Sequence, residues 1–139
     1  MIKNEVKERK ISRLQRNLSY LKTIASISLD KFLGNFEKQL ACRYTIQECV
    51  QICIDIAFHL CIVNKFGEPI NYKDSFKILS QNQILSDQLS IKMQNWVGVR
   101  NLVSHIYEEV DDSRIYSFIV DDLHDFDEFI STLNQLQKI

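Results

Sequence analysis

Four side chains suited to acid–base or phosphate chemistry lie within eight residues of one another, in an otherwise mostly apolar stretch: Arg100, Asn101, His105 and Tyr107. A histidine exchanges protons near neutral pH, because its unperturbed pKa is about 6.5. An arginine stays charged and presents planar donors that match two phosphate oxygens. These groups suit RNA cleavage without a metal, because the ribose 2′-hydroxyl can attack its own neighbouring phosphate while the protein moves protons and stabilises charge.

Helical geometry would sort these four side chains into two pairs. Asn101 and His105 are i, i+4 neighbours and would lie side by side on one face of a helix. Arg100 and Tyr107 are i, i+7 neighbours and would form a second stripe, roughly 10 Å long. If both stripes border one cleft, Arg100 and His105 form the catalytic pair, and Asn101 orients the imidazole or donates to a phosphate oxygen.

The same residues also allow a purely structural interpretation. Arg100 could pair with a carboxylate of the acidic C-terminal region, and His105 could be a hydrogen-bonded core histidine. A further polar pair, Asp55 and His59, is also i, i+4 on an earlier predicted helix. That pair could support the site from behind, or it could be a buried or interface contact.

The elements that must position these residues are all predicted to be helical. The chain of 139 residues has only three glycines and one proline, too few for the tight turns of a β-rich fold. Apolar periodicity predicts five helices, at about 4–34, 36–65, 73–80, 86–107 and 114–137. The expected fold is all-α: one domain over residues 1–139, built as an antiparallel four-helix-type bundle with an additional short helix.

The helix predicted over 36–65 also carries the cysteines. Its inward-facing residues are expected to be Leu40, Tyr44, Cys49, Ile52, Ile56, Leu60 and Val63. The four cysteines, Cys42, Cys49, Cys53 and Cys61, include no C-x-x-C pair, and three of them fall on one stripe of the helix. Core packing is therefore the expected role of the cysteines, and neither a metal site nor a cofactor is predicted.

Charge is distributed unevenly along the chain, although the formal net charge is only −1. Residues 1–22 hold seven lysines and arginines against two glutamates, and residues 108–128 hold nine carboxylates against one arginine. The small net charge argues against a protein that coats nucleic acid by bulk electrostatics. Two interpretations stay open: solvated helix faces that pair with each other or with a second subunit, or a basic rim for phosphates and an acidic flank for a basic partner.

The helix predicted over 86–107 is apolar on more than one face, which is typical of an element that is central or shared with another subunit. A homodimer through this region is the hypothesis. No uncharged stretch is long enough to span a bilayer, and the first residues have no apolar signal-peptide core. A cytoplasmic protein with no membrane partner is therefore expected.

The motif R-N-x-x-x-H-x-Y over residues 100–107 resembles the R-x4-H-x-Y signature of HEPN-domain toxins of the HepT type. The flanking residues follow the family's order as well, across roughly residues 9–136. They are Arg43-Tyr44, Asp55 with His59, Pro69 then Tyr72, and the Trp96-Val97-Gly98-Val99-Arg100-Asn101 approach.

This resemblance implies a metal-independent endoribonuclease that acts as the toxin of a toxin–antitoxin pair, with Arg100 and His105 as its essential residues. It implies an all-α homodimer whose cleft lies at or near the subunit interface. The implied partner is an MntA-type nucleotidyltransferase antitoxin that transfers AMP to Tyr107. An alternative is a non-catalytic HEPN binding module that partners such a nucleotidyltransferase.

Overall fold

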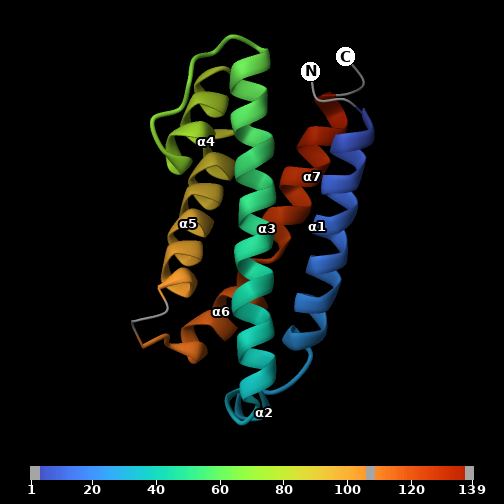
Figure 1. The fold of residues 1–139 in the computed structure, drawn as a ribbon, viewed down its shortest axis with the longest axis vertical. Helices are drawn as coiled ribbons and strands as arrows, with labels where there is room; N and C mark the ends of the chain where they lie inside the picture. Colours follow the sequence, from blue (N-terminus) through green and yellow to red (C-terminus); the bar gives the residue numbers. More distant parts are fainter. Residues whose placement is uncertain (1–3, 106–108, 137–139) are drawn as a thin grey trace.

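The computed structural model describes residues 4–105 and 109–136, and these ranges contain seven α-helices and no strand (Figure 1). The helices are α1 (Asn4–Ala25), α2 (Leu29–Leu33), α3 (Phe36–Val63), α4 (Tyr72–Gln81), α5 (Asp87–Ser104), α6 (Asp112–Asp122) and α7 (His124–Leu136). The predicted all-α fold is confirmed.

The long helices form an up-and-down bundle around α3. Figure 1 shows α3 running the length of the molecule, with α1 on one side and the α4–α5 pair on the other. α6 contacts α1 and α2, whereas α7 contacts α5, so the C-terminal helices close the bundle. The short loops between successive helices favour this antiparallel arrangement.

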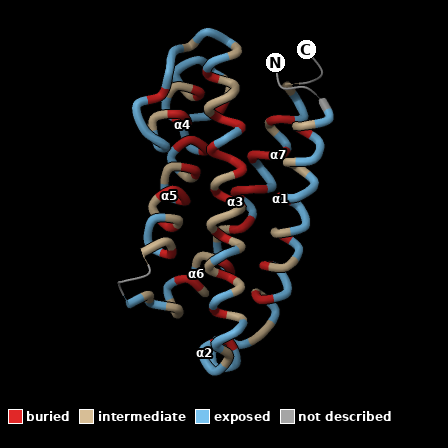
Figure 2. The backbone as a smooth tube through the Cα atoms, viewed as in Figure 1, coloured by how far each residue is buried: buried red, intermediate tan, exposed pale blue. Residues whose placement is uncertain are grey.

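A single cluster of buried residues runs through the bundle. In Figure 2, the segments coloured as buried face the interior of the bundle. All four cysteines belong to it and none forms a disulfide, which confirms the predicted packing role. Burial raises the pKa of the Cys42 and Cys49 thiols to about 12 and that of Cys61 to about 11. These thiols are therefore protonated at neutral pH and behave as small apolar side chains.

The first predicted helix is wrong at its end, because residues 4–34 form two helices rather than one. The Ser26 hydroxyl donates to the carbonyl of Thr23 at 2.6 Å, and the Ser28 hydroxyl accepts from the backbone N–H of Lys31 at 3.2 Å. Such hydroxyl bonds compete with the helical ladder and favour caps and turns. Ser28 consequently becomes the N-cap of α2, and Gly34 ends that helix as predicted.

The last two predicted helices also differ from the observed ones. α5 ends at Ser104 instead of continuing to 107, and His105 follows in an extended conformation with φ −83° and ψ 91°. The range 114–137 is divided at Leu123, where the backbone N–H of Phe126 bonds to the Leu123 carbonyl over three residues. Neither glycine nor proline marks this division, so apolar periodicity runs through it.

α3 exposes a face that was expected to be buried. Leu40 is 45% exposed and Tyr44 66% exposed, whereas Cys49, Ile52 and Ile56 are buried as predicted. α3 is apolar on nearly every side, so its periodicity does not specify which face meets the core. α3 packs against α1, α4 and α5, and this packing leaves Leu40 and Tyr44 exposed.

α3 is also long and apolar enough to cross a membrane by length and composition, with a mean hydropathy of 1.6 over its most apolar window. Half of that window is buried inside the bundle, and the core helix of a soluble protein meets the same two criteria. This helix is therefore only weak evidence for a membrane span.

Candidate active site

Arg100 lies near the C-terminal end of α5, on a backbone held by packing. The Ser86 hydroxyl caps α5 by accepting a hydrogen bond from the Leu89 N–H at 3.1 Å. α5 contacts α3, α4 and α7. Its buried residues are Leu89, Ser90, Met93, Trp96, Val97, Val99 and Val103. The position of Arg100 is therefore set by a rigid helix.

The Arg100 guanidinium packs on an aromatic ring from a different helix. Its Cζ lies 5.2 Å from the ring centroid of Tyr72, the first residue of α4. The Tyr72 ring in turn meets Phe58 of α3 edge-on, with 6.1 Å between centroids. Because a cation is attracted to the face of an aromatic ring, this stack of three helices holds the guanidinium in place.

No protein acceptor compensates the Arg100 charge in the part of the chain that the structure describes. Its Nε is buried and has no hydrogen-bond partner. Leaving a buried donor unpaired costs about 1–3 kcal/mol, so the arrangement is unfavourable unless another molecule supplies the acceptor. A phosphate group is the acceptor that a guanidinium matches best.

The structural alternative for Arg100 was an ion pair with the acidic C-terminal region. That region makes other ion pairs instead: Asp112 with Arg43 at 2.6 Å, Asp127 with Lys22 at 3.3 Å, and Glu128 with Lys92 at 3.6 Å. The Lys22–Asp127 pair also links the basic and acidic stretches of the sequence. These carboxylates are thus engaged in the fold, and Arg100 pairs with none of the described carboxylates of this region.

His105 directly follows α5 as its C-cap residue and is partly buried. Since the helix has ended there, His105 leaves the helical register, and the predicted side-by-side pairing with Asn101 does not follow from helix geometry. Asn101 is exposed on the last turn, and its carbonyl accepts from the Ser104 hydroxyl at 3.2 Å. Tyr107, the predicted modification site, lies outside the described residues.

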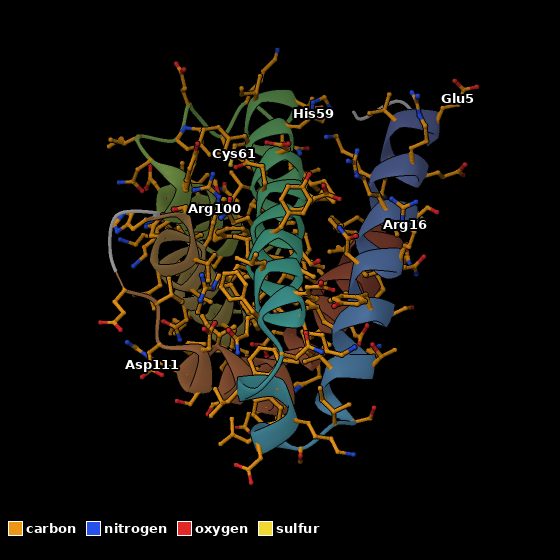
Figure 3. All side chains as sticks on the ribbon, turned by 60° about the horizontal axis from the view of Figure 1, so that its bottom comes forward. Glu5, Arg16, His59, Cys61, Arg100 and Asp111 are labelled. Atoms are coloured by element: carbon orange, nitrogen blue, oxygen red, sulfur yellow. The ribbon has the colours of Figure 1, made fainter. Side chains whose placement is uncertain are left out.

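Asp55 and His59 are not joined by a hydrogen bond. Asp55 accepts from the Gln51 amide at 2.8 Å and pairs with Lys10 of α1 at 3.6 Å. His59, one turn further along α3, has a buried Nε2 with no hydrogen-bond partner. Figure 3 shows His59 and Arg100 on different sides of α3. The structure therefore does not bring this pair to the Arg100 site within one chain.

Tyr72 is the contact of Arg100 that reasoning from spacing misses. It lies 28 residues before Arg100, so no helical repeat connects the two. The one available signal is its place in the family's order after Pro69. As for metals, residues 4–105 and 109–136 contain no group of three or more His, Cys, Asp or Glu side chains that could hold an ion.

Comparison with known proteins identifies the family of the chain and its relatives. A family model described as Ribonuclease HepT-like matches residues 14–133. The mRNA nuclease HepT of Shewanella oneidensis is 28% identical over 130 residues, which cover 94% of this chain and 97% of that protein. The tRNA nuclease HepT of Aphanizomenon flos-aquae is 29% identical over 127 residues, which cover 91% and 86%.

The fold also matches a solved structure of the tri-AMPylated Shewanella oneidensis HEPN toxin in complex with an MNT antitoxin. The TM-score is 0.88 at 28% identity, and the match covers 96% of this chain and 99% of that one. The similarity therefore extends over nearly the whole bundle, including the helix that carries Arg100.

Proposed function

Because the chain belongs to the HepT-like ribonuclease family, we propose that it is a metal-independent endoribonuclease and the toxin of a toxin–antitoxin pair. The 2′-hydroxyl attacks the adjacent phosphorus, and the bond to the 5′-oxygen breaks, leaving a 2′,3′-cyclic phosphate and a free 5′-hydroxyl. His105 transfers the proton that leaves the 2′-hydroxyl or the one that joins the departing oxygen. Arg100 stabilises the charge of the pentavalent phosphorane.

The observation that supports this role most directly is the uncompensated Arg100 guanidinium on the Tyr72 ring. A transition-state stabiliser must be positioned before the substrate arrives and must keep its donors unoccupied. The Tyr72 ring positions the Arg100 guanidinium without a carboxylate. A carboxylate in that place would compete with the substrate phosphate for the guanidinium.

Cleavage of a mixed-sequence RNA in EDTA by the purified chain tests the proposal. Arg100→Ala and His105→Ala should each abolish cleavage while the circular dichroism spectrum and melting temperature stay close to those of the parent. Asn101→Ala should retain part of the activity, since Asn101 has a supporting role. Binding of the antitoxin with no cleavage by the parent would instead favour the non-catalytic module.

We further propose that an MntA-type nucleotidyltransferase inactivates the chain by AMPylation of Tyr107. The Tyr107 oxygen attacks the α-phosphorus of ATP, and pyrophosphate leaves. The product carries a phosphodiester and a nucleoside two residues along the chain from His105, and we expect them to compete with the substrate. After incubation with the enzyme and ATP, mass spectrometry should locate one or more AMP groups on the peptide that contains Tyr107, and Tyr107→Phe should remain unmodified and toxic.

The proposal includes a homodimer, formed through the outer face of α5. Most apolar residues of α5 are buried within the same chain, so a central position explains them. Ile91 is still 59% exposed and Leu102 38% exposed, on one face with Gly98 between them. A Cβ at Gly98 would meet nothing within 4 Å, so this face is open to close approach by a second helix. Light scattering should give twice the chain mass, and Leu102→Asp should give a monomer.

A further inference from the structure

We propose that the cationic face of α1 is a second RNA contact surface, which holds a single-stranded part of the substrate several nucleotides away from the scissile phosphate. This inference rests on the proposed ribonuclease function and adds where the substrate extends. The surface, called the α1 ridge below, consists of Arg9, Lys10, Ser12, Arg13 and Arg16.

The α1 ridge surrounds a shallow hollow of about 500 Å³. Four of its side chains are cationic, and no carboxylate lines the hollow. Arg9 and Arg16 are separated by two helical turns, or about 10 Å along the axis. A cationic surface of that length can contact more than one phosphate of the same strand. The ridge thus has the sign and length of a phosphate-binding surface.

Only part of this positive charge is neutralised by the protein. Arg13 donates to both carboxylate oxygens of Glu48, at 2.8 and 3.2 Å, and Lys10 pairs with Asp55. Arg9 and Arg16 are exposed and have no ion pair or side-chain hydrogen bond with any described residue. These two arginines therefore keep their donors available for an external anion.

An exposed aromatic ring lies beside the ridge and favours RNA over other anions. Tyr44 of α3 is 66% exposed, and its hydroxyl donates to Glu48 at 3.1 Å, the same carboxylate that holds Arg13. Asn17 also donates to Glu48 at 2.8 Å. Arginines beside an exposed ring fit a single strand, whose phosphates meet the cations while an unstacked base packs on the ring.

The Glu48 carboxylate makes this arrangement rigid. Hydrogen bonds from Arg13 and Asn17 lower the pKa of Glu48 to about 2, so it stays ionised at physiological pH. Tyr44 and Arg13 are consequently held at one anchor. Figure 3 shows Arg16 on the opposite side of α3 from Arg100. A strand that reaches both must cross α3, which is about 10 Å wide with its side chains, so only a substrate of several nucleotides contacts the ridge.

The first test compares two double variants with the same change in net charge. Arg9→Gln/Arg16→Gln removes the unpaired ridge cations, and Lys31→Gln/Lys77→Gln removes two exposed cations of α2 and α4. Binding of a fluorescent 2′-O-methyl oligonucleotide of about 20 nucleotides is measured by anisotropy over a range of salt concentrations. The ridge variant should bind about tenfold more weakly, and its salt slope should be smaller by about 1.4, since each single-strand phosphate contact contributes about 0.7. Equal losses in both variants would overturn the proposal.

Substitutions of Glu48 and of Tyr44 should change the oligonucleotide affinity in opposite directions. Glu48→Gln frees Arg13 from its carboxylate, so oligonucleotide affinity should rise by several-fold. Tyr44→Ala should weaken binding by about tenfold through lost stacking, whereas Tyr44→Phe should bind like the parent. A fall in affinity for Glu48→Gln, with an unchanged melting temperature, would contradict the charge argument.

Substrate length separates this inference from the proposed catalysis. The ridge variant should cleave a dinucleotide at the parent rate and show a raised KM only for long RNA. Arg100→Ala should lose cleavage of both the dinucleotide and the long RNA, yet still bind the 2′-O-methyl strand through the ridge.

Other occupants of the α1 ridge give different results. If the ridge variant keeps its RNA affinity but loses binding to vesicles of phosphatidylcholine and phosphatidylserine, the surface binds membranes. If the ridge variant alters only self-association, the α1 ridge binds the acidic stretch of a second copy. Either of these two results would overturn the RNA proposal.

Discussion

Two polar groups one helical turn apart on α5, Trp96 and Arg100, differ in whether the protein supplies their hydrogen-bond partners. The Trp96 indole donates to Asp125 at 3.0 Å, and Asp125 is only 4% exposed. Lys92 and His124 also approach this carboxylate, at 4.0 and 3.5 Å. Arg100, by contrast, has a buried Nε with no hydrogen-bond partner among the described residues, and its guanidinium lies over the Tyr72 ring.

This difference separates residues that hold the fold from the residue that we propose to bind the substrate phosphate. Around Trp96 the protein supplies acceptor and counter-charges itself, so each group stabilises the others. Around Arg100 the protein leaves a donor unsatisfied at a cost to stability, which is the pattern of a prepared binding group. Variants of Arg100 and of Asp125, the acceptor of Trp96, should therefore affect different measurements.

The largest expected effect is on catalysis, at Arg100. Arg100→Met keeps an unbranched side chain on the Tyr72 ring but removes the charge, so RNA cleavage should fall by about 10²–10³-fold or more. The free energy of unfolding should stay constant or rise by about 1 kcal/mol, because an unpaired buried donor disappears. Cleavage rates measure the first effect, and chemical denaturation measures the free energy of unfolding. A strong loss of stability would mean that Arg100, like Asp125, holds the fold.

Asp125 should show the reverse behaviour. Asp125→Ala leaves the buried Trp96 N–H without its acceptor, so the free energy of unfolding should fall by about 1–3 kcal/mol. Lys92 keeps its second carboxylate, Glu128, at 3.6 Å. Cleavage per folded molecule should not change. The control is Asp121→Ala, an exposed neighbour on α6 that should stay within about 0.5 kcal/mol of the parent. Lost activity in a fully folded Asp125→Ala protein would contradict the assignment of Asp125 to the fold alone.

Tyr72 should give a smaller, purely positional effect. Tyr72→Leu removes the ring that holds the guanidinium, so kcat should fall by about tenfold. Tyr72→Phe keeps the ring face and should retain activity. Rescue by phenylalanine distinguishes positioning from a role of the hydroxyl, and an inactive phenylalanine variant would assign Tyr72 a direct chemical role.

The smallest expected effect concerns Gly98, on the outer face of the same helix. Gly98→Ala should stabilise the single chain by about 0.5–1 kcal/mol, because alanine favours helix and the added Cβ meets no neighbour within 4 Å. If two copies pack across this face, the same methyl group should raise the dimer dissociation constant. Denaturation at low concentration and sedimentation at high concentration measure the two effects separately.

The helices and the central motif were predictable because both depend on local spacing. Arg100 and His105 are neighbours along one segment, and the cysteines share one stripe of α3. The breaks after Ala25 and at Leu123 escaped prediction because serine caps and a single three-residue hydrogen bond interrupt a helix without glycine or proline. The exposure of Tyr44 escaped it because α3 is apolar on nearly all sides.

The sequence by itself therefore determined the helical class, the buried cysteines and the chemical types gathered around residue 100, since these follow from composition and short-range periodicity. Only the tertiary structure decided which charges are compensated. Asp112 forms an ion pair with Arg43, and Glu48 forms one with Arg13. The Arg100 guanidinium instead lies over the Tyr72 ring. Ion pairs and hydrogen bonds depend on distances of a few ångströms between helices, and the packing of the whole bundle sets those distances.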